Sequence, residues 1–181
     1  MVTILLGIGF EEAEALVPAD LMRRAGIEVT LVGVSGPQVA GAHGITVAAD
    51  ATLDQVDPAQ VELVVLPGGL GGVASVEACP AALELVRQVY AAGRYVAAIC
   101  AAPTILANLG ILGTRKAVCY PGLEDQLGQA QALPGQQVVV DGNVITGEAP
   151  GAAFAFGLKL IEVLKGAHIA DQVKHDTHYR G

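Results

Sequence analysis

Short apolar runs, separated by polar and glycine-containing segments, recur along most of the chain. Runs of the right length for buried strands are Val2–Leu6, Glu28–Val34, Val61–Leu66, Tyr95–Ile99 and Lys116–Tyr120. Patterns typical of helices lie between or after them, at Glu11–Ala25, Pro80–Ala92, Ala152–Lys165 and Ala167–Lys174. Alternation of strands and helices predicts an α/β fold in which helices cover both faces of a mostly parallel sheet. We expect a three-layer sandwich formed by a single domain over residues 1–181.

Smaller signals complete this pattern. Asp141-Gly142 separates two apolar segments, Gln137–Val140 and Asn143–Thr146, and predicts a β-hairpin. A short strand is expected at Ile45–Val47, and a loose polar end at His175–Gly181.

The stretch R-Y-V-A-A-I-C-A-A-P places Cys100 directly after a predicted strand and just before a helical pattern that begins at Pro103. A sharp turn at this point would hold the sulfur near free amides at the helix start, which favour a thiolate. The alternative is that Cys100 is an ordinary buried thiol, as free cysteines usually are.

Three predicted strands carry candidate chemistry at their carboxyl ends. The segments are Gly9–Glu14, Gly68–Gly72 and Cys100–Ala102. Sites in parallel sheets form beyond these ends, so we expect the three segments to converge. This convergence favours a functional role for Cys100.

Composition limits the classes of partner. The net charge of −8 argues against nucleic acids and anionic membranes. There is no apolar run long enough for a transmembrane helix and no basic leader at the start, so no membrane association is expected. The cysteines, Cys79, Cys100 and Cys119, are odd in number and lack zinc-type spacing, which suits a reducing compartment; we therefore expect a cytoplasmic protein.

Other motifs have weaker interpretations. Gly69–Ala74 fits a dinucleotide-binding pattern formally but lacks the acidic residue that should follow, so a backbone donor near the thiol is preferred. His175 and His178 could ligate a metal, but a polar terminus is the simpler interpretation, and no metal or cofactor is expected. Cys119 is interpreted as a core thiol.

Several motifs together resemble the ThiJ/PfpI superfamily. They are G-F-E-E-A-E-A-L-V-P, M-R-R-A-G-I-E-V-T, V-V-L-P-G-G and A-A-I-C-A-A-P, within a similarity that runs from about Val2 to Val173. The branch they resemble most contains the Parkinsonism-associated deglycase and its bacterial relatives. The resemblance implies a flavodoxin-like sandwich, usually a homodimer, with a nucleophile elbow at Cys100.

The resemblance also implies roles for individual residues. Cys100 would be the reactive thiol and Glu14 its protonated carboxyl partner, while the amides of Gly69 and Ala101 would face the reactive centre. His43 falls where a partner subunit often contributes to the site. Tyr120 stands where this branch commonly has a histidine, so the thiol would lack that imidazole partner.

Two functions remain open at this stage. The first is a cofactor-independent glyoxalase or deglycase that acts on methylglyoxal, glyoxal or their adducts through Cys100. The second is a redox-responsive, chaperone-like or oxidative-stress protein with little turnover. For the pair itself we predict that Cys100 is rich in thiolate at pH 7 while Glu14 carries the proton, because two adjacent buried anions repel each other.

Overall fold

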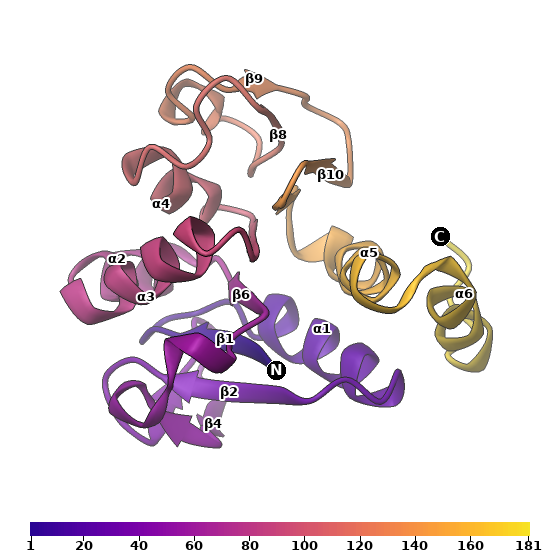
Figure 1. Cartoon of the computed structure of the whole chain (residues 1–181), viewed down its shortest axis with the longest axis horizontal. Coiled ribbons are helices and arrows are strands. Elements are labelled where there is room, and N and C mark those ends of the chain that lie inside the picture. The colour runs from indigo at the N-terminus through magenta and orange to yellow at the C-terminus, as the bar shows by residue number, and fades with distance from the viewer.

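The computed structural model describes all 181 residues, and its centre is a seven-stranded sheet with the strand order β10-β11-β7-β6-β1-β2-β5 (Figure 1). The strands are β1 (Val2–Leu6), β2 (Val29–Gly33), β5 (Ala51–Thr52), β6 (Leu63–Leu66), β7 (Tyr95–Ile99), β10 (Val138–Asp141) and β11 (Val144–Gly147). All neighbours pair in parallel except β10 and β11, which form the hairpin predicted at Asp141-Gly142. The inner order β2-β1-β6-β7-β11 is that of a flavodoxin-like fold, as expected.

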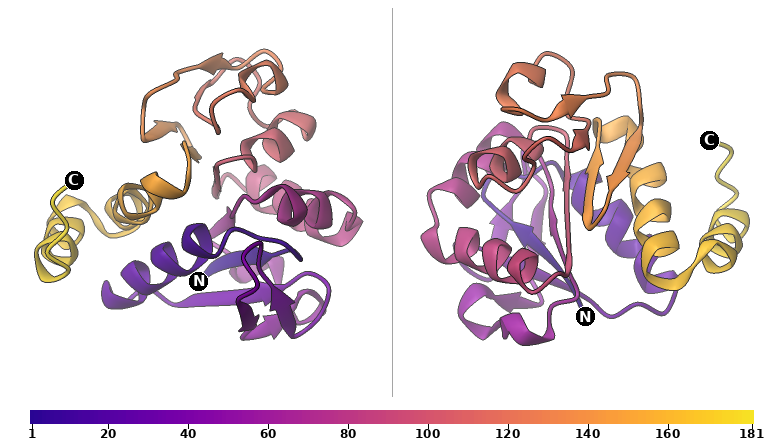
Figure 2. Two further views of the ribbon diagram at one scale, coloured as in Figure 1. Left: turned by 180° about the vertical axis from the view of Figure 1, so that it is seen from behind. Right: turned by 45° about the horizontal axis from the view of Figure 1, so that its top comes forward.

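Helices cover both faces of this sheet. One face carries α1 (Glu12–Arg24) and α5 (Ala153–Lys165), with α6 (Ala167–Asp176) outside α5 (Figure 2). The other carries α2 (Leu70–Glu77), α3 (Pro80–Ala91) and the short α4 (Pro103–Asn108). Each helix falls short of the length and apolarity that crossing a bilayer demands.

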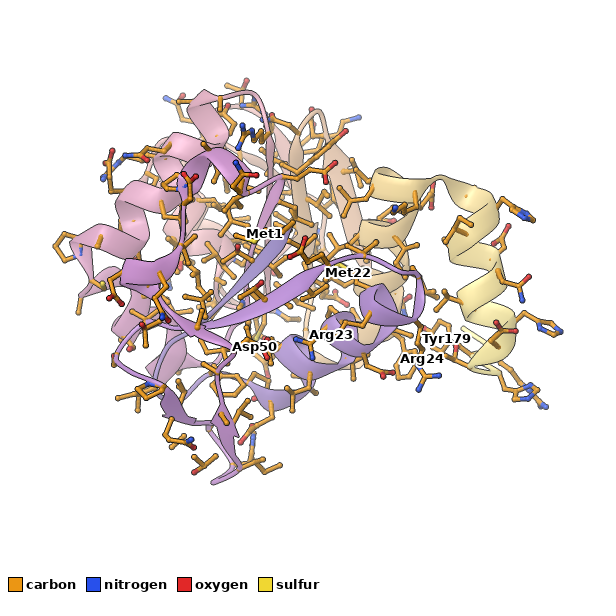
Figure 3. The ribbon with its side chains drawn as sticks, turned by 60° about the horizontal axis from the view of Figure 1, so that its bottom comes forward. Met1, Met22, Arg23, Arg24, Asp50 and Tyr179 are labelled. Carbon is orange, nitrogen blue, oxygen red and sulfur yellow. The ribbon has the colours of Figure 1, made fainter.

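Glycine and charge fix the contacts around α1. A Cβ added at Gly157 of α5 would lie 3.0 Å from the Cα of Pro18, so the two helices approach closely because this glycine has no side chain. At the end of α1, Arg23 donates to the Val29 carbonyl at 2.9 Å and to Asp50 at 2.6 Å, and Asp50 accepts the Leu31 amide (Figure 3). These bonds attach the end of the helix to the edge of the sheet.

Two small sheets lie outside the main one. The strands β3 (Gln38–Ala40) and β4 (Thr46–Ala48) form an antiparallel pair, so the short strand expected at Ile45–Val47 is present and shifted by one residue. The strands β8 (Lys116–Ala117) and β9 (Gln131–Ala132) form a parallel pair. Short 3₁₀ turns complete the chain at Leu53–Gln55, Pro58–Gln60, Glu124–Gln126 and Pro150–Ala152.

The prediction of a strand over Lys116–Tyr120 is wrong beyond Ala117. The Val118 amide donates to the Thr146 hydroxyl at 2.9 Å, and the Tyr120 amide donates to the Cys100 carbonyl at 2.8 Å. Because these partners replace a ladder of strand pairs, residues 118–120 run as a loop over the end of the main sheet.

Helix α2 was not predicted, because its first turn is rich in glycine, a poor helix former. Tertiary contacts explain these glycines. A Cβ at Gly72 would lie 2.7 Å from the Cα of Phe10, and one at Gly71 would lie 3.2 Å from the Cα of Gly9. The start of α2 therefore needs glycine to pack against the loop that follows β1.

The expectation of a loose polar end at His175–Gly181 is wrong in part. His175 and Asp176 belong to α6, and Tyr179 stacks on Phe154 of α5 with ring centroids 4.9 Å apart. Lys174 donates to the Gly181 carbonyl at 2.8 Å. The end of the chain is folded back against the helical layer.

Candidate functional site

Cys100 lies at the tight turn between β7 and α4. Its φ of +66° is in the left-handed region, a conformation that costs a non-glycine residue about 1–3 kcal/mol and persists where the surroundings impose it. The Cys100 amide donates to the Gly147 carbonyl at 3.0 Å, which continues the β7–β11 pairing through the turn. The strand, turn and helix expected from the sequence are therefore present; the role of Cys100 as a nucleophile stays a prediction.

Glu14 reaches the same place from the first turn of α1. Its side chain is completely buried, and Oε2 accepts the Gly68 amide at 2.7 Å. Oε1 is also buried but has no partner within hydrogen-bond distance. The Glu14 carboxyl and the Cys100 thiol interact closely enough to shift each other's pKa.

Gly68 lies between these two groups. A Cβ at this position would be 2.7 Å from both the Cys100 Cβ and the Glu14 Oε2. Only glycine leaves room for the thiol and the carboxyl to meet while its own amide binds the carboxyl. Gly68 lies in one of the predicted strand-end segments, but the donor role was expected of Gly69 and Ala101. The position of Pro67-Gly68 directly after a buried strand was the available signal.

Burial dominates the electrostatics of the pair. It raises the pKa of Glu14 to about 7, partly offset by the interaction with the Cys100 thiol and by the hydrogen bond from the Gly68 amide. Burial, and then the charge of Glu14, raise the pKa of Cys100 to about 12. The prediction that Glu14 holds its proton near neutral pH is supported in direction, whereas the predicted thiolate-rich Cys100 is contradicted.

Backbone amides provide the favourable interactions with the sulfur. The amides of Gly69 and Ala101 lower the Cys100 pKa, although by less than burial and Glu14 raise it. Gly69 has a φ of +81° and immediately precedes α2, so its left-handed conformation aims its amide at the thiol. The helix after Cys100 is short, with only six residues.

A cavity of about 560 Å³ opens beside the thiol. It brings together five of the six residues expected at the site. The cavity is lined by Glu11, His43, Gly69, Leu70, Cys100, Ala101, Tyr120, Pro121, Gly122, Leu123 and Pro150. Glu14 is the sixth residue that was expected at the site; it is buried and does not line the cavity. Cys119 is also buried and does not line the cavity.

His43 enters this site from the loop between β3 and β4. Its ring Nδ1 lies 3.0 Å from the Glu12 Oε2 and 3.5 Å from the Glu11 Oε1. The Glu12 Oε1 accepts the amides of His43 and Ile45, at 2.8 and 3.3 Å. The hydrogen bond with Glu12, and then the charges of Glu11 and Glu12, raise the His43 pKa.

The side chains of Glu11, Glu12 and His43 have ligand atoms within 4.8 Å of one another, which is close enough to hold a metal ion. The Glu12 oxygens already accept hydrogen bonds, so the arrangement is explained as a charge pair that holds the loop. His175 and His178 lie far along the chain on α6 and its end, with ring centroids 6.4 Å apart, and line no part of the thiol cavity.

Comparisons with known proteins find relatives along most of the chain. The profile of the DJ-1/PfpI family matches residues 1–163. The chain is 37% identical to the Parkinson disease protein 7 homolog of Danio rerio over 94% of this chain and 93% of that protein. It is 32% identical to a deglycase from Pyrococcus horikoshii over 86% of this chain and 94% of that protein.

A solved structure is similar over nearly the whole chain. The crystal structure of Drosophila melanogaster DJ-1beta superposes with a TM-score of 0.95 at 36% identity, covering 99% of this chain and 98% of that one.

Proposed function

Because the chain belongs to the DJ-1/PfpI family, we propose that it is a cofactor-independent glyoxalase or deglycase that converts α-oxoaldehydes such as methylglyoxal and glyoxal, or their adducts, through Cys100. The observation that carries this proposal is the buried Glu14 carboxyl beside the thiol, with one oxygen that has no partner. The deglycase activity in the name of the Pyrococcus horikoshii relative supports the same substrate class.

The first step uses the proton that the pair shares. Cys100 starts as a thiol because its pKa is raised, and Glu14 with a pKa of about 7 is a carboxylate in a large share of molecules at neutral pH. As the sulfur bonds to the aldehyde carbon, the thiol proton passes to Glu14 and then to the aldehyde oxygen, which gives a hemithioacetal. The amides of Gly69 and Ala101, which interact with the sulfur, would stabilise the oxyanion that forms on the way.

The following steps move hydrogen between neighbouring carbons. Glu14 takes the proton from the carbon bonded to sulfur, giving an enediol, and returns a proton to the adjacent carbon, giving a thioester. Water then hydrolyses the thioester and releases a 2-hydroxy acid and the free thiol. Methylglyoxal plus water gives lactate, with no net oxidation.

The test is lactate formation from methylglyoxal by the purified protein. We expect no activity in Cys100→Ser and a loss of about 100-fold or more in Glu14→Gln, which keeps the shape but cannot exchange a proton. Cys119→Ser is the matched control, because this thiol is buried but does not line the cavity. Wild-type activity no greater than that of Cys100→Ser would refute the proposal. Activity only on preformed amine adducts, with free methylglyoxal scavenged, would favour the deglycase form.

A redox-responsive, chaperone-like role is the second candidate, and the unpaired Glu14 oxygen favours it as well. A protonated Glu14 could donate to a sulfinate at Cys100 and hold oxidation at that stage. Mild peroxide should then give a sulfinate at Cys100 by mass spectrometry and change the protein's ability to keep an unfolding client soluble. An unchanged ability in Cys100→Ala, with and without peroxide, would exclude this role.

A further inference from the structure

The cavity beside Cys100 is much larger than the small aldehydes considered so far. Its volume of about 560 Å³ is in the range of sites that hold drug-sized ligands. Methylglyoxal has only a handful of non-hydrogen atoms, and its two carbonyl groups must lie at the floor, against Cys100 and the amides of Gly69 and Ala101. Most of the cavity would then remain for whatever substituent the dicarbonyl carries.

The walls around that remaining space are apolar. The apolar lining residues are Leu70, Tyr120, Pro121, Leu123 and Pro150. Leu70 is 76% exposed and Tyr120 is 47% exposed, and both are among the few large hydrophobic side chains left open to solvent. Single exposed hydrophobic residues are ordinary, but two in one cavity with a candidate nucleophile point to a ligand surface.

The main chain holds Leu70 and Tyr120 close to the reactive centre. Leu70 directly follows Gly69, whose amide faces the sulfur. Tyr120 is held by its amide, which donates to the Cys100 carbonyl at 2.8 Å. A substituent on a dicarbonyl bound at Cys100 would therefore meet these two side chains at fixed positions.

The charges near the cavity disfavour an anionic substituent. Glu11 lines the cavity, and Glu12 and Glu14 lie close by. His43, the cation-forming group at the rim, is engaged by Glu12 and Glu11. A neutral, apolar substituent fits this environment best.

We infer that the site prefers α-oxoaldehydes with a bulky apolar substituent, aryl or branched alkyl, over glyoxal and methylglyoxal, and that Leu70 and Tyr120 determine this preference. This inference rests on the proposed function, and its chemistry is the same. R–CO–CHO plus water gives R–CH(OH)–COOH, so phenylglyoxal would give mandelate with no oxidant or reductant.

The experiment compares kcat/KM for glyoxal, methylglyoxal and phenylglyoxal in wild type and in Leu70→Ser and Tyr120→Ser. Intrinsic reactivity differs among these aldehydes, so the informative quantity is the phenylglyoxal-to-glyoxal ratio of each variant relative to wild type. Burial of a phenyl group against one wall should make this ratio fall by about 5- to 10-fold in each variant, mainly through KM for phenylglyoxal. Val140→Ser is the control, because Val140 is exposed but lies outside the cavity.

Ratios that change no more than in Val140→Ser would overturn the inference, whereas absence of turnover with every aldehyde would instead refute the proposed function. In that case alkylation of Cys100 by N-benzyl iodoacetamide and by iodoacetamide, followed by mass spectrometry, tests the same walls without turnover. The benzyl-to-plain rate ratio should fall several-fold in Leu70→Ser and Tyr120→Ser. An unchanged ratio would overturn the apolar preference on its own.

Discussion

The buried carboxyl of Glu14 should make the protein less stable as the pH rises, and Glu14→Gln should remove this dependence. The folded-state pKa of about 7 lies above the ordinary value of 4.5, so the folded protein binds this proton more tightly than the unfolded chain does. The resulting stability is fully present below pH 4.5 and is lost as the pH rises to about 7. Above that pH the loss is constant.

The size of the effect follows from the two pKa values. The rise from 4.5 to about 7 corresponds to about 3 kcal/mol, at about 1.4 kcal/mol for each pH unit. Most of this, about 2–3 kcal/mol, falls between pH 5 and pH 8. Glutamine can still accept the Gly68 amide through its oxygen and never ionises, so the variant should gain that amount relative to wild type over this range.

Urea denaturation of both proteins at pH 5 and pH 8 measures the difference. Glu12→Gln provides a comparison on the same helical turn. Burial alone would raise the Glu12 pKa, but the hydrogen bonds from its own amide, His43 and Ile45 lower it overall. Glu12 therefore contributes stability that is present above its unfolded pKa of 4.5 and is lost only as the pH falls below that value. Because Glu12 also raises the His43 pKa, its replacement should cost more at pH 5, where His43 is charged, than at pH 8, and it leaves the Glu14 titration in place.

A stability difference between Glu14→Gln and wild type that stays constant from pH 5 to pH 8 would refute the reasoning. It would mean that Glu14 ionises in the folded protein as easily as in water, and that it cannot hold a proton for catalysis near neutral pH.

Three further results are expected. Iodoacetamide should alkylate Cys100 faster in Glu14→Gln than in wild type at pH 8, because the Glu14 charge that raises the thiol pKa is gone; equal rates by mass spectrometry would contradict this. Gly68→Ala should cost about 1–3 kcal/mol in urea denaturation and most of the lactate formation, because its Cβ would lie 2.7 Å from the Cys100 Cβ; full activity would show that thiol and carboxyl need no such contact. Sedimentation should show a homodimer, as the family resemblance implies. A monomer near 18.4 kDa at micromolar concentration would contradict both the dimer and a contribution of His43 to a site shared between subunits.

Most of the sheet could be predicted because strands buried on both faces read as continuous apolar runs. The run at Lys116–Tyr120 has the same appearance, yet Val118 and Tyr120 bond to Thr146 and Cys100 instead of a neighbouring strand. No local pattern distinguishes these outcomes. Helix α2 was missed for a related reason, since its glycines serve contacts with Gly9 and Phe10 that exist only in the folded chain.

Most of the residues that form the site could be predicted from the sequence, but their pKa values could not. Strand ends and the family resemblance pointed to Cys100, Glu14 and Gly69. The thiol pKa depends on how dry the site is and on how close Glu14 lies, and a sequence shows neither. The contact between His43 and Glu12 joins residues far apart along the chain, so it too appears only in three dimensions.

The hydrogen bond between the Tyr120 amide and the Cys100 carbonyl couples the turn at Cys100 to the part of the cavity wall that Tyr120 forms. The carbonyl cannot rotate away from its left-handed geometry without releasing that amide. A covalent change at the sulfur that displaces the Cys100 peptide would therefore be transmitted directly to Tyr120 through this hydrogen bond. An adduct or oxidised state with a shifted turn should carry the aromatic ring along, so the shape of the opening would report the chemical state of the thiol.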